Sequence, residues 1–349
     1  MSMLQTLPDA PLDIVGDVHG ELDALQALLH HLGYDPIGRH PAGRRLVFVG
    51  DLCDRGPDSP GVIDLVRRMV EAGTAQAIIG NHEINLLRGD RKHGNNWFWD
   101  ADAPQDNEFE PYRRISHTER QSLLQFLEAL PLVLVRDDLR VVHAAWDAGA
   151  IQKIEESSGQ LASHLFEIWD LSVERGLEDA GFLAEAESEG NRWGHALNNR
   201  NSEVPFLEAI GHCDVERQMG NPVRVIVSGT ERLARAPFFS SGKWRFSERT
   251  RWWDDYQEAI PVVIGHYWRL PYPTASRASG GLFQNVGPTA WHGALRNVFC
   301  IDYSAGARFE ERLAQRPLGS TTRLTALQWP ERTLVTEDGT IIQTTNYGG

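Results

Sequence analysis

The seven residues Gly50-Asp51-Leu52-Cys53-Asp54-Arg55-Gly56 decide how this chain is interpreted. They follow the apolar run RLVFVG (residues 45–50), which predicts a buried strand. A helix is predicted directly after them, with Asp58 or Ser59 as its N-cap and Gly73 past its end. A strand, a glycine-bounded polar turn and a helix in this order indicate an α/β fold whose polar turn lies at the carboxyl end of a strand.

The same pattern occurs twice more in the first half of the chain. LDIVG (12–16) leads into Asp17-Val18-His19-Gly20, and QAIIG (76–80) leads into Asn81-His82-Glu83. Strand–helix–strand spacing of this kind implies right-handed βαβ units and parallel pairing. Ligands of open α/β sheets bind at the carboxyl ends of the strands, so the three polar turns are expected to form one site.

Two later strand candidates also end in a histidine. His143 follows the run RVV (140–142), and His266 follows PVVIG (261–265). A single histidine at the end of an apolar strand is usually a core residue. Five successive strand ends that each deliver Asp, His or Asn are a much stronger signal, because these side chains are ligands for Mn²⁺, Fe or Zn²⁺.

The remaining chain divides into a β-rich C-terminal third and a central segment of different character. A capping box at Ser116 predicts a helix, followed by a hairpin or two adjacent strands at 132–135 and 140–145. Further strands are expected at 224–229, 261–266, 297–302, 322–329, 333–337 and 340–344. Residues 150–260 are first helical and acidic, then aromatic and basic, which predicts an inserted cap within a single domain spanning 1–349.

Composition limits the classes of partner. The 349 residues carry a formal net charge of −14, so we expect no general attraction to nucleic acid or to an anionic membrane. No apolar run approaches the roughly 18 residues of a membrane span, and the N-terminus lacks the pattern of a secretory signal. The three cysteines form too sparse a set for a disulfide scaffold, which favours a cytoplasmic protein.

The motifs GDVHG (16–20), GDLCDRG (50–56) and GNHE (80–83) resemble those of the metallophosphoesterase (calcineurin-like) superfamily. They are most similar to the phosphoprotein phosphatase type, in a bacterial-like form. The resemblance covers about residues 12–145 and 261–305. It implies an αββα sandwich, that is, two sheets flanked by helices, and a phosphatase without an organic cofactor.

The resemblance also implies roles for individual residues. Two divalent metal ions, most often Mn²⁺ with Fe or Zn²⁺ as alternatives, would share the carboxylate of Asp51 and activate a bridging water that attacks phosphorus in line. The implied ligands are Asp17, His19 and Asp51 for the first ion, and Asp51, Asn81, His143 and His266 for the second. His82 would protonate the leaving oxygen, Asp54 would orient His82, and Arg55 would grip the phosphoryl oxygens.

The sequence departs from the family pattern in two places. Ile79 stands where an arginine usually precedes GNHE, so one phosphate-binding cation is missing or comes from elsewhere. His143 is followed by two alanines where two glycines are usual. The basic cluster Lys243, Arg245, Arg249 and Arg251 is one source of the missing cation, with Arg249 and Arg251 as candidate substrate-binding residues. A solvated basic strand face is the favoured explanation of the cluster at this stage.

Three functions remain open at this stage. The leading interpretation is hydrolysis of phosphomonoesters, including those of phosphoproteins, because Asp54 would keep His82 protonated for a poor leaving group. The second is a symmetrical diadenosine tetraphosphatase-like activity, indicated by Arg55-Gly56-Pro57-Asp58-Ser59 and Ile301-Asp302-Tyr303. The third is a binding protein that has kept the fold without catalysis, which the loss of a ligand or of His82 would favour; no such loss occurs.

Overall fold

The computed structural model describes residues 2–100, 104–157, 159–271 and 281–348. Its strands are β1 (Leu4–Thr6), β2 (Leu12–Val15), β3 (Arg45–Phe48), β4 (Ala75–Ala77), β5 (Val133–Arg136), β6 (Leu139–Val142), β7 (Glu231–Ser240), β8 (Lys243–Arg249), β9 (Val262–Ile264), β10 (Val298–Cys300), β11 (Thr325–Trp329), β12 (Thr333–Thr336) and β13 (Ile341–Gln343). Its α-helices are α1 (Leu22–Leu32), α2 (Ser59–Glu71), α3 (Asn81–Leu87), α4 (His117–Glu128), α5 (Ala148–Glu156), α6 (Ala162–Asp179), α7 (Phe182–Leu197), α8 (Glu208–Met219), α9 (Pro222–Ser228) and α10 (Arg308–Leu313). Short 3-10 helices cover Asn96–Phe98, Pro104–Phe109, Trp252–Asp254 and Ala305–Ala307.

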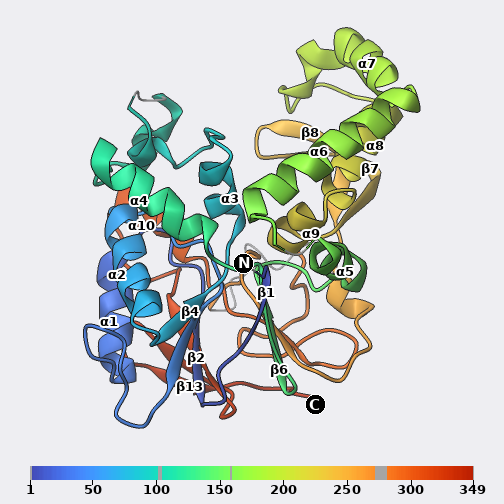
Figure 1. Ribbon diagram of the computed structural model, residues 1–349. Helices are drawn as coiled ribbons and strands as arrows, with labels where there is room; N and C mark the ends of the chain where they lie inside the picture. Colours follow the sequence, from blue (N-terminus) through green and yellow to red (C-terminus); the bar gives the residue numbers. More distant parts are fainter. Residues whose placement is uncertain (1, 101–103, 158, 272–280, 349) are drawn as a thin grey trace.

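Two sheets pack face to face with helices on their outer faces, which confirms the predicted αββα fold. One sheet has the order β13-β12-β11-β2-β3-β4 and the other the order β1-β5-β6-β9-β10. Buried apolar side chains from both sheets, such as Ile14, Val47, Val141 and Phe299, form one core between them. Helices α1 and α2 pack on the outer side of the first sheet (Figure 1).

The predicted parallel pairing is present where the polar turns were found. β2, β3 and β4 are parallel neighbours, as are β6 and β9. The first sheet is mixed, because β11 runs antiparallel to β2. β5 and β6 pair antiparallel, so of the two predicted alternatives the hairpin is the one present. The carboxyl ends of β2, β3 and β4 therefore lie at one edge of the first sheet, and those of β6 and β9 at one edge of the second.

Local capping matches the sequence in two helices. The side chain of Asp58 accepts a hydrogen bond from the Gly61 amide at the start of α2. Ser116 and Glu119 form the predicted capping box of α4. Both caps satisfy backbone amides that have no partner within the helix.

The strand predicted at 224–229 is wrong, because this segment is part of helix α9. Asn221 accepts hydrogen bonds from the amides of Val223 and Arg224, and Pro222 stands in the first turn. These helix-start signals outweigh the β-branched run that follows, which is buried against the neighbouring helices and so tolerates helical geometry.

Residues between β6 and β9 form the most extended part of the molecule. Helices α6, α7 and α8 and the hairpin β7–β8 project away from the two sheets (Figure 1). A small separate core, which includes Val204, Leu207 and Phe246, holds the hairpin against these helices. No helix among the described residues is long and apolar enough to cross a membrane.

Candidate active site

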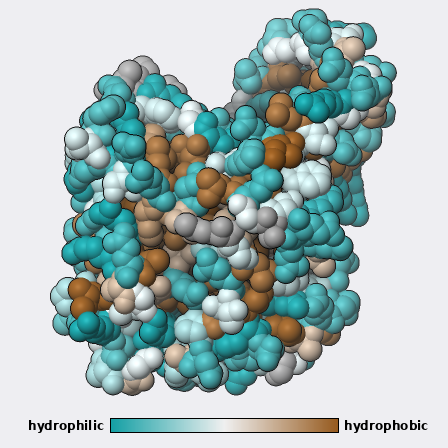
Figure 2. All heavy atoms as spheres, viewed as in Figure 1, coloured by the Kyte–Doolittle hydropathy of each residue, from teal (hydrophilic) through white to brown (hydrophobic). Residues whose placement is uncertain are grey.

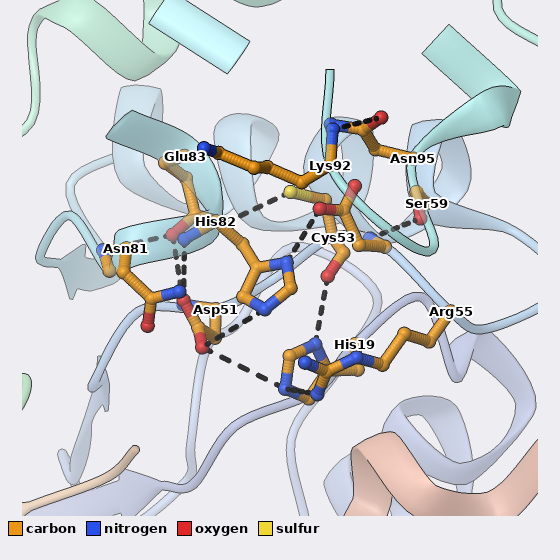
Figure 3. Close-up of polar contacts among 12 residues, drawn as sticks. His19, Asp51, Cys53, Arg55, Ser59, Asn81, His82, Glu83, Lys92 and Asn95 are labelled. Atoms are coloured by element: carbon orange, nitrogen blue, oxygen red, sulfur yellow. Dashed lines mark hydrogen bonds and ion pairs between the residues drawn. The ribbon is translucent and has the colours of Figure 1, made fainter. Parts of the chain in front are cut away.

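The predicted residues of the first three polar turns lie together at the carboxyl ends of β2, β3 and β4. Oδ2 of Asp51 is the centre of the group, since Nε2 of His19 lies 3.7 Å from it and Nε2 of His82 lies 3.9 Å from it. In Figure 3, dashed lines join the carboxylate of Asp51 to the rings of both His19 and His82. All three residues are buried.

The two later strands add their histidines to the same carboxylate. Nε2 of His143 lies 3.3 Å from Oδ2 of Asp51. Oδ1 of Asn81 lies 3.3 Å from Nε2 of His143 and 2.8 Å from Nδ1 of His266. Oδ2 of Asp17 accepts a hydrogen bond from the His266 amide. All six residues predicted as metal ligands are thus brought together from five strand ends.

Two of the imidazoles have their outward nitrogen fixed by a backbone carbonyl. Nδ1 of His19 donates to the carbonyl of Cys53 at 3.0 Å, and Nδ1 of His143 donates to the carbonyl of Val49 at 2.7 Å. Such a bond selects the tautomer whose Nε2 lone pair is available to a cation. Both Nε2 atoms face Asp51.

The electrostatics of the group favour binding of a cation. Burial and the neighbouring carboxyl of Asp302 raise the pKa of Asp17 well above its ordinary value. Burial opposes protonation of His143, but the carboxylates of Asp51 and Asp17 outweigh it and raise the pKa of His143 to about 10. A divalent cation among these carboxylates would relieve the repulsion between them.

The donor atoms fit such cations. Buried polar atoms without a hydrogen-bond partner include Oδ1 of Asp17 and Nε2 of His266. Two groups of three residues share Asp51, and in each group the three possible ligand atoms lie within 4.8 Å of one another. The first group is His19, Asp51 and His82, and the second is Asp51, His143 and His266. Carboxylate oxygens with imidazole nitrogens suit Mn²⁺, Fe or Zn²⁺. His82 belongs to the first of these groups, so its distance to His19 and Asp51 does not distinguish it from a metal ligand.

Backbone geometry at the site is strained. His19, Asp51, Asp54, Arg55 and His266 all have positive φ, between 48° and 74°. Non-glycine residues adopt this region at a cost, and such residues cluster at functional sites. A β-carbon at Gly80 would overlap Oδ1 of Asp51, so only glycine lets the third turn approach the second so closely.

His82 has a partner of its own. Its Nδ1 donates to Oδ2 of Asp54 at 2.5 Å, while Oδ1 of Asp54 accepts from Nε1 of Trp97 at 2.6 Å. Asp54 and Trp97 are both buried. The two donors fix the carboxylate, which fixes the ring of His82 with Nε2 directed toward the site.

Arg55 reaches the group from the side. Its Nη1 lies 3.3 Å from Nε2 of His19, and its guanidinium carbon lies 5.1 Å from the ring centroid of Trp268. Ile79, which stands in place of the usual arginine, is fully buried and contributes no charge.

Arg249 is exposed, and its guanidinium carbon lies 5.8 Å from the ring centroid of Tyr267, the neighbour of His266. Burial and then the charge of Arg249 lower the pKa of His266.

The structure separates the other members of the basic cluster from the metal ligands. Arg251 forms an ion pair with Asp254 at 2.8 Å on the surface. Lys243 lies at the far end of β8, opposite Ser240 near the tip of the hairpin. Arg249 is therefore the member of the cluster that lies beside a predicted ligand.

Three residues that contribute to the site were assigned no role in it by the sequence analysis. The Glu83 carboxylate, which is fully buried, accepts from the amides of Asp51, Leu52 and Gly80. Asp302 follows β10 at the same edge, and burial raises its pKa to about 6. Its position directly after an apolar run was the available signal, as it was for Asp17. Trp97 gave no signal, because it lies in a 3-10 helix far from any motif.

A comparison with protein families agrees with this geometry. The model of the calcineurin-like phosphoesterase family matches residues 10–231. The chain belongs to this family. The matched region contains four of the five strand ends that form the site, and His266 lies beyond it.

Two curated relatives of this calcineurin-like phosphoesterase are named as tetraphosphatases. The chain is 52% identical over 79 residues to the asymmetrical bis(5'-nucleosyl)-tetraphosphatase PrpE of Halalkalibacterium halodurans, which covers 22% of this chain and 32% of the relative. It is 33% identical over 156 residues to the symmetrical bis(5'-nucleosyl)-tetraphosphatase of Ralstonia nicotianae, 43% of this chain and 48% of the relative. The chain thus covers less than two thirds of either relative's length.

A solved structure supports the fold over the whole length. The cold-active protein-tyrosine phosphatase of a Shewanella species aligns with a TM-score of 0.50 and 16% identity, covering 98% of this chain and 83% of that one. At this identity the likeness concerns the architecture of the calcineurin-like phosphoesterase, not its substrate.

Proposed function

We propose that the chain is a metal-dependent phosphoesterase that hydrolyses phosphomonoesters. The observation that carries the proposal is the convergence of His19, His143 and His266 on the single carboxylate of Asp51, with Asp17 and Asn81 both in contact with His266. Burying several carboxylate and imidazole groups so close together costs free energy that a bound cation would offset. Membership of the calcineurin-like phosphoesterase family supports the same interpretation.

Two divalent ions would be held by the predicted ligands. Asp17, His19 and Asp51 would hold the first, and Asp51, Asn81, His143 and His266 the second, with manganese as the proposed metal. When bound, such ions supply Lewis-acid chemistry, polarising the phosphoryl group and lowering the pKa of water. The three free cysteines support the further proposal of a cytoplasmic location.

The proposed reaction is an in-line displacement. A water oxygen forms a bond to phosphorus and the water gives up one proton to solvent, while the bond from phosphorus to the ester oxygen breaks. The ester oxygen receives a proton from Nε2 of His82, which regains one from solvent before the next turnover. Its bond to Asp54 supports this role for His82, because the carboxylate holds the ring with Nδ1 engaged and Nε2 turned toward the site. Arg55 would bind phosphoryl oxygens through its planar guanidinium.

The missing cation at Ile79 is proposed to be replaced by Arg249. Its guanidinium lies beside Tyr267 and next to His266, where it would face the substrate. Arg251 remains a weaker candidate, because its charge is already paired with Asp254. We also propose that residues 150–260 form an inserted cap beside the metal ligands, since they connect the neighbouring strands β6 and β9.

Hydrolysis of dinucleoside polyphosphates is the second candidate function. The names of the two curated relatives favour it. The leaving group of such a substrate is a nucleotide, which departs readily, so the buried His82–Asp54 pair favours phosphomonoesters instead.

The test is a comparison of substrates with Mn²⁺ added. The proposal predicts chelator-sensitive hydrolysis of an aryl phosphate or a phosphopeptide with kcat/KM above that for diadenosine tetraphosphate. A preference of more than about tenfold for the dinucleotide, roughly 1.4 kcal/mol in transition-state binding, would promote the second candidate. Metal binding without turnover of any substrate would favour a binding protein.

A further inference from the structure

The indole of Trp268 lies beside the guanidinium of Arg55, the proposed phosphate-binding group. The guanidinium carbon of Arg55 is 5.1 Å from the centroid of the Trp268 ring, a distance at which a cation and an aromatic ring attract each other. Trp268 stands two residues after the predicted ligand His266 and is 36% exposed, although its neighbours Tyr267 and Arg269 are buried. Packing of the core therefore does not explain why an indole stands at this position.

Arg55 is surrounded on other sides by backbone and by one imidazole. Its amide donates to the carbonyl of Gly94 at 2.9 Å, and its Nη1 lies 3.3 Å from Nε2 of His19. A β-carbon at Gly306 would come within 2.8 Å of Nη1, so the guanidinium can keep this position only beside a glycine. The guanidinium is thus placed among His19, Gly306 and the ring of Trp268.

The backbone next to Trp268 is fixed by the turn that follows β10. The amide of Arg269 donates to the carbonyl of Asp302 at 2.9 Å, and Oγ of Ser304 donates to the carbonyl of Arg269 at 3.0 Å. The buried guanidinium of Arg269 donates to the carbonyl of Cys300. Because its backbone is already ordered, Trp268 can hold a neighbouring side chain at a small further loss of conformational entropy.

An indole holds an arginine differently from a carboxylate. Arg44, for example, is paired with the carboxylate of Asp13 at 2.9 Å, whereas no carboxylate of the described residues forms an ion pair with Arg55. A carboxylate neutralises the guanidinium and occupies its N–H donors, while an aromatic face attracts the cation and leaves the donors available to phosphoryl oxygens. The placement of Arg55 matters the more because Ile79 supplies no charge.

We propose that Trp268 is a positioning residue that holds the guanidinium of Arg55 in place to bind the phosphoryl group. The inference rests on the proposed function for the role of Arg55, and it adds how this arginine is held without a carboxylate partner. Figure 2 shows the surface hollowed between helix α3, which begins at the site, and the projecting helices α6 to α8. A phosphorylated substrate therefore has room to approach.

The direct test measures binding of inorganic phosphate, which is not turned over, to the full chain with Mn²⁺ by isothermal titration calorimetry. Trp268→Ala is expected to weaken phosphate binding about fivefold through loss of the cation–π contact. Trp268→Phe should restore most of the affinity because it keeps an aromatic face, whereas Trp268→Leu, which keeps only apolar bulk, should not. Phe238→Ala removes a ring of similar exposure, 38%, from β7 and is the matched control, which should bind phosphate as the wild type does.

A double-mutant cycle shows whether the indole acts through Arg55. Arg55→Ala alone should weaken phosphate binding about tenfold or more, in keeping with the loss of a charge-assisted contact. If Trp268 only positions Arg55, Trp268→Ala should cause no further loss in the Arg55→Ala background. In the active protein, kcat/KM for p-nitrophenyl phosphate should follow the same order: wild type, then Trp268→Phe, then Trp268→Ala.

Three results would overturn the inference. The first is phosphate binding that is unchanged in Trp268→Ala. The second is an equal loss from Trp268→Ala in the wild-type and Arg55→Ala backgrounds, which would mean that the indole acts independently of Arg55. The third is restoration by Leu as complete as that by Phe, which would reduce Trp268 to apolar bulk. A wild-type protein that binds phosphate but hydrolyses no phosphate ester would instead refute the proposed function, and the titrations would still decide the role of Trp268.

Discussion

The ring of His82 and the carboxylate of Asp54 form a buried pair, with Nδ1 and Oδ2 2.5 Å apart. The ring plane of His82 stands nearly perpendicular to that of His19, with centroids 4.8 Å apart. Nε2 of His82 therefore points into the space between Asp51 and His19, where a leaving oxygen could receive a proton. The pair links a residue of helix α3 to the turn after β3, two segments that the parallel sheet brings together.

Replacement of His82 by Asn should separate proton donation from metal binding. We expect kcat to fall by about 10²–10⁴, the usual contribution of general acid catalysis, while metal content stays unchanged. The loss should be smaller for an aryl phosphate with a good leaving group, which needs little protonation. The measurement is kcat for two aryl phosphates of different leaving-group pKa, with metal content determined by mass spectrometry. Nε2 of His82 lies 3.9 Å from Oδ2 of Asp51, close enough for both to bind one ion. A loss of bound metal in the variant would therefore show that His82 is a metal ligand.

Replacement of Asp51 by Asn should remove both activity and metal. One carboxylate lies within reach of ligands from both groups, so no second residue can take its place. The wild-type protein should lose activity in a chelator and recover it with Mn²⁺. Chelation should also lower the melting temperature of the wild-type protein, because a metal at a hundredfold excess over its Kd contributes about 2.7 kcal/mol to the free energy of unfolding.

The control for this prediction is the same chelator experiment on Asp51→Asn. Its melting temperature should not respond to Mn²⁺. If the variant gained as much stability from Mn²⁺ as the wild type, the ions would bind elsewhere and the proposed centre would be wrong.

The site was more predictable than the segment beside it, for a physical reason. Asp17, Asp51 and His143 each follow an apolar strand directly, and parallel strands bring their carboxyl ends together whatever the rest of the chain does. The contact between Trp97 and Asp54 depends on tertiary packing, which leaves no periodic signal in the sequence. The run 224–228 shows the limit, because its β-branched residues form a helix once Asn221 caps it and its neighbours bury it.

Replacement of Glu83 by Gln should destabilise the fold of the site. The two carboxylate oxygens accept from three backbone amides, those of Asp51, Leu52 and Gly80. An amide side chain offers a single acceptor oxygen and places a donor against a backbone amide. The expected loss is about 2 kcal/mol in the free energy of unfolding, measured by urea denaturation without metal. Glu187→Gln, at an exposed position of α7, should change it by less than about 0.5 kcal/mol.

The two candidate substrate arginines should behave differently when each is replaced by Ala. Arg249 lies beside Tyr267, and among the charged residues it lowers the pKa of His266 the most. Arg251 is paired with Asp254. We expect Arg249→Ala to raise KM for phosphorylated substrates about tenfold, in keeping with the loss of a charge-assisted contact to phosphate. Arg251→Ala should raise KM by less than about twofold, because exposed ion pairs contribute little and its charge is already engaged. Steady-state kinetics on one aryl phosphate checks both variants under the same conditions. Unchanged KM values in both variants would mean that the hairpin only presents a solvated basic face. Arg55 would then be the one arginine left, among those proposed, to bind the phosphoryl oxygens.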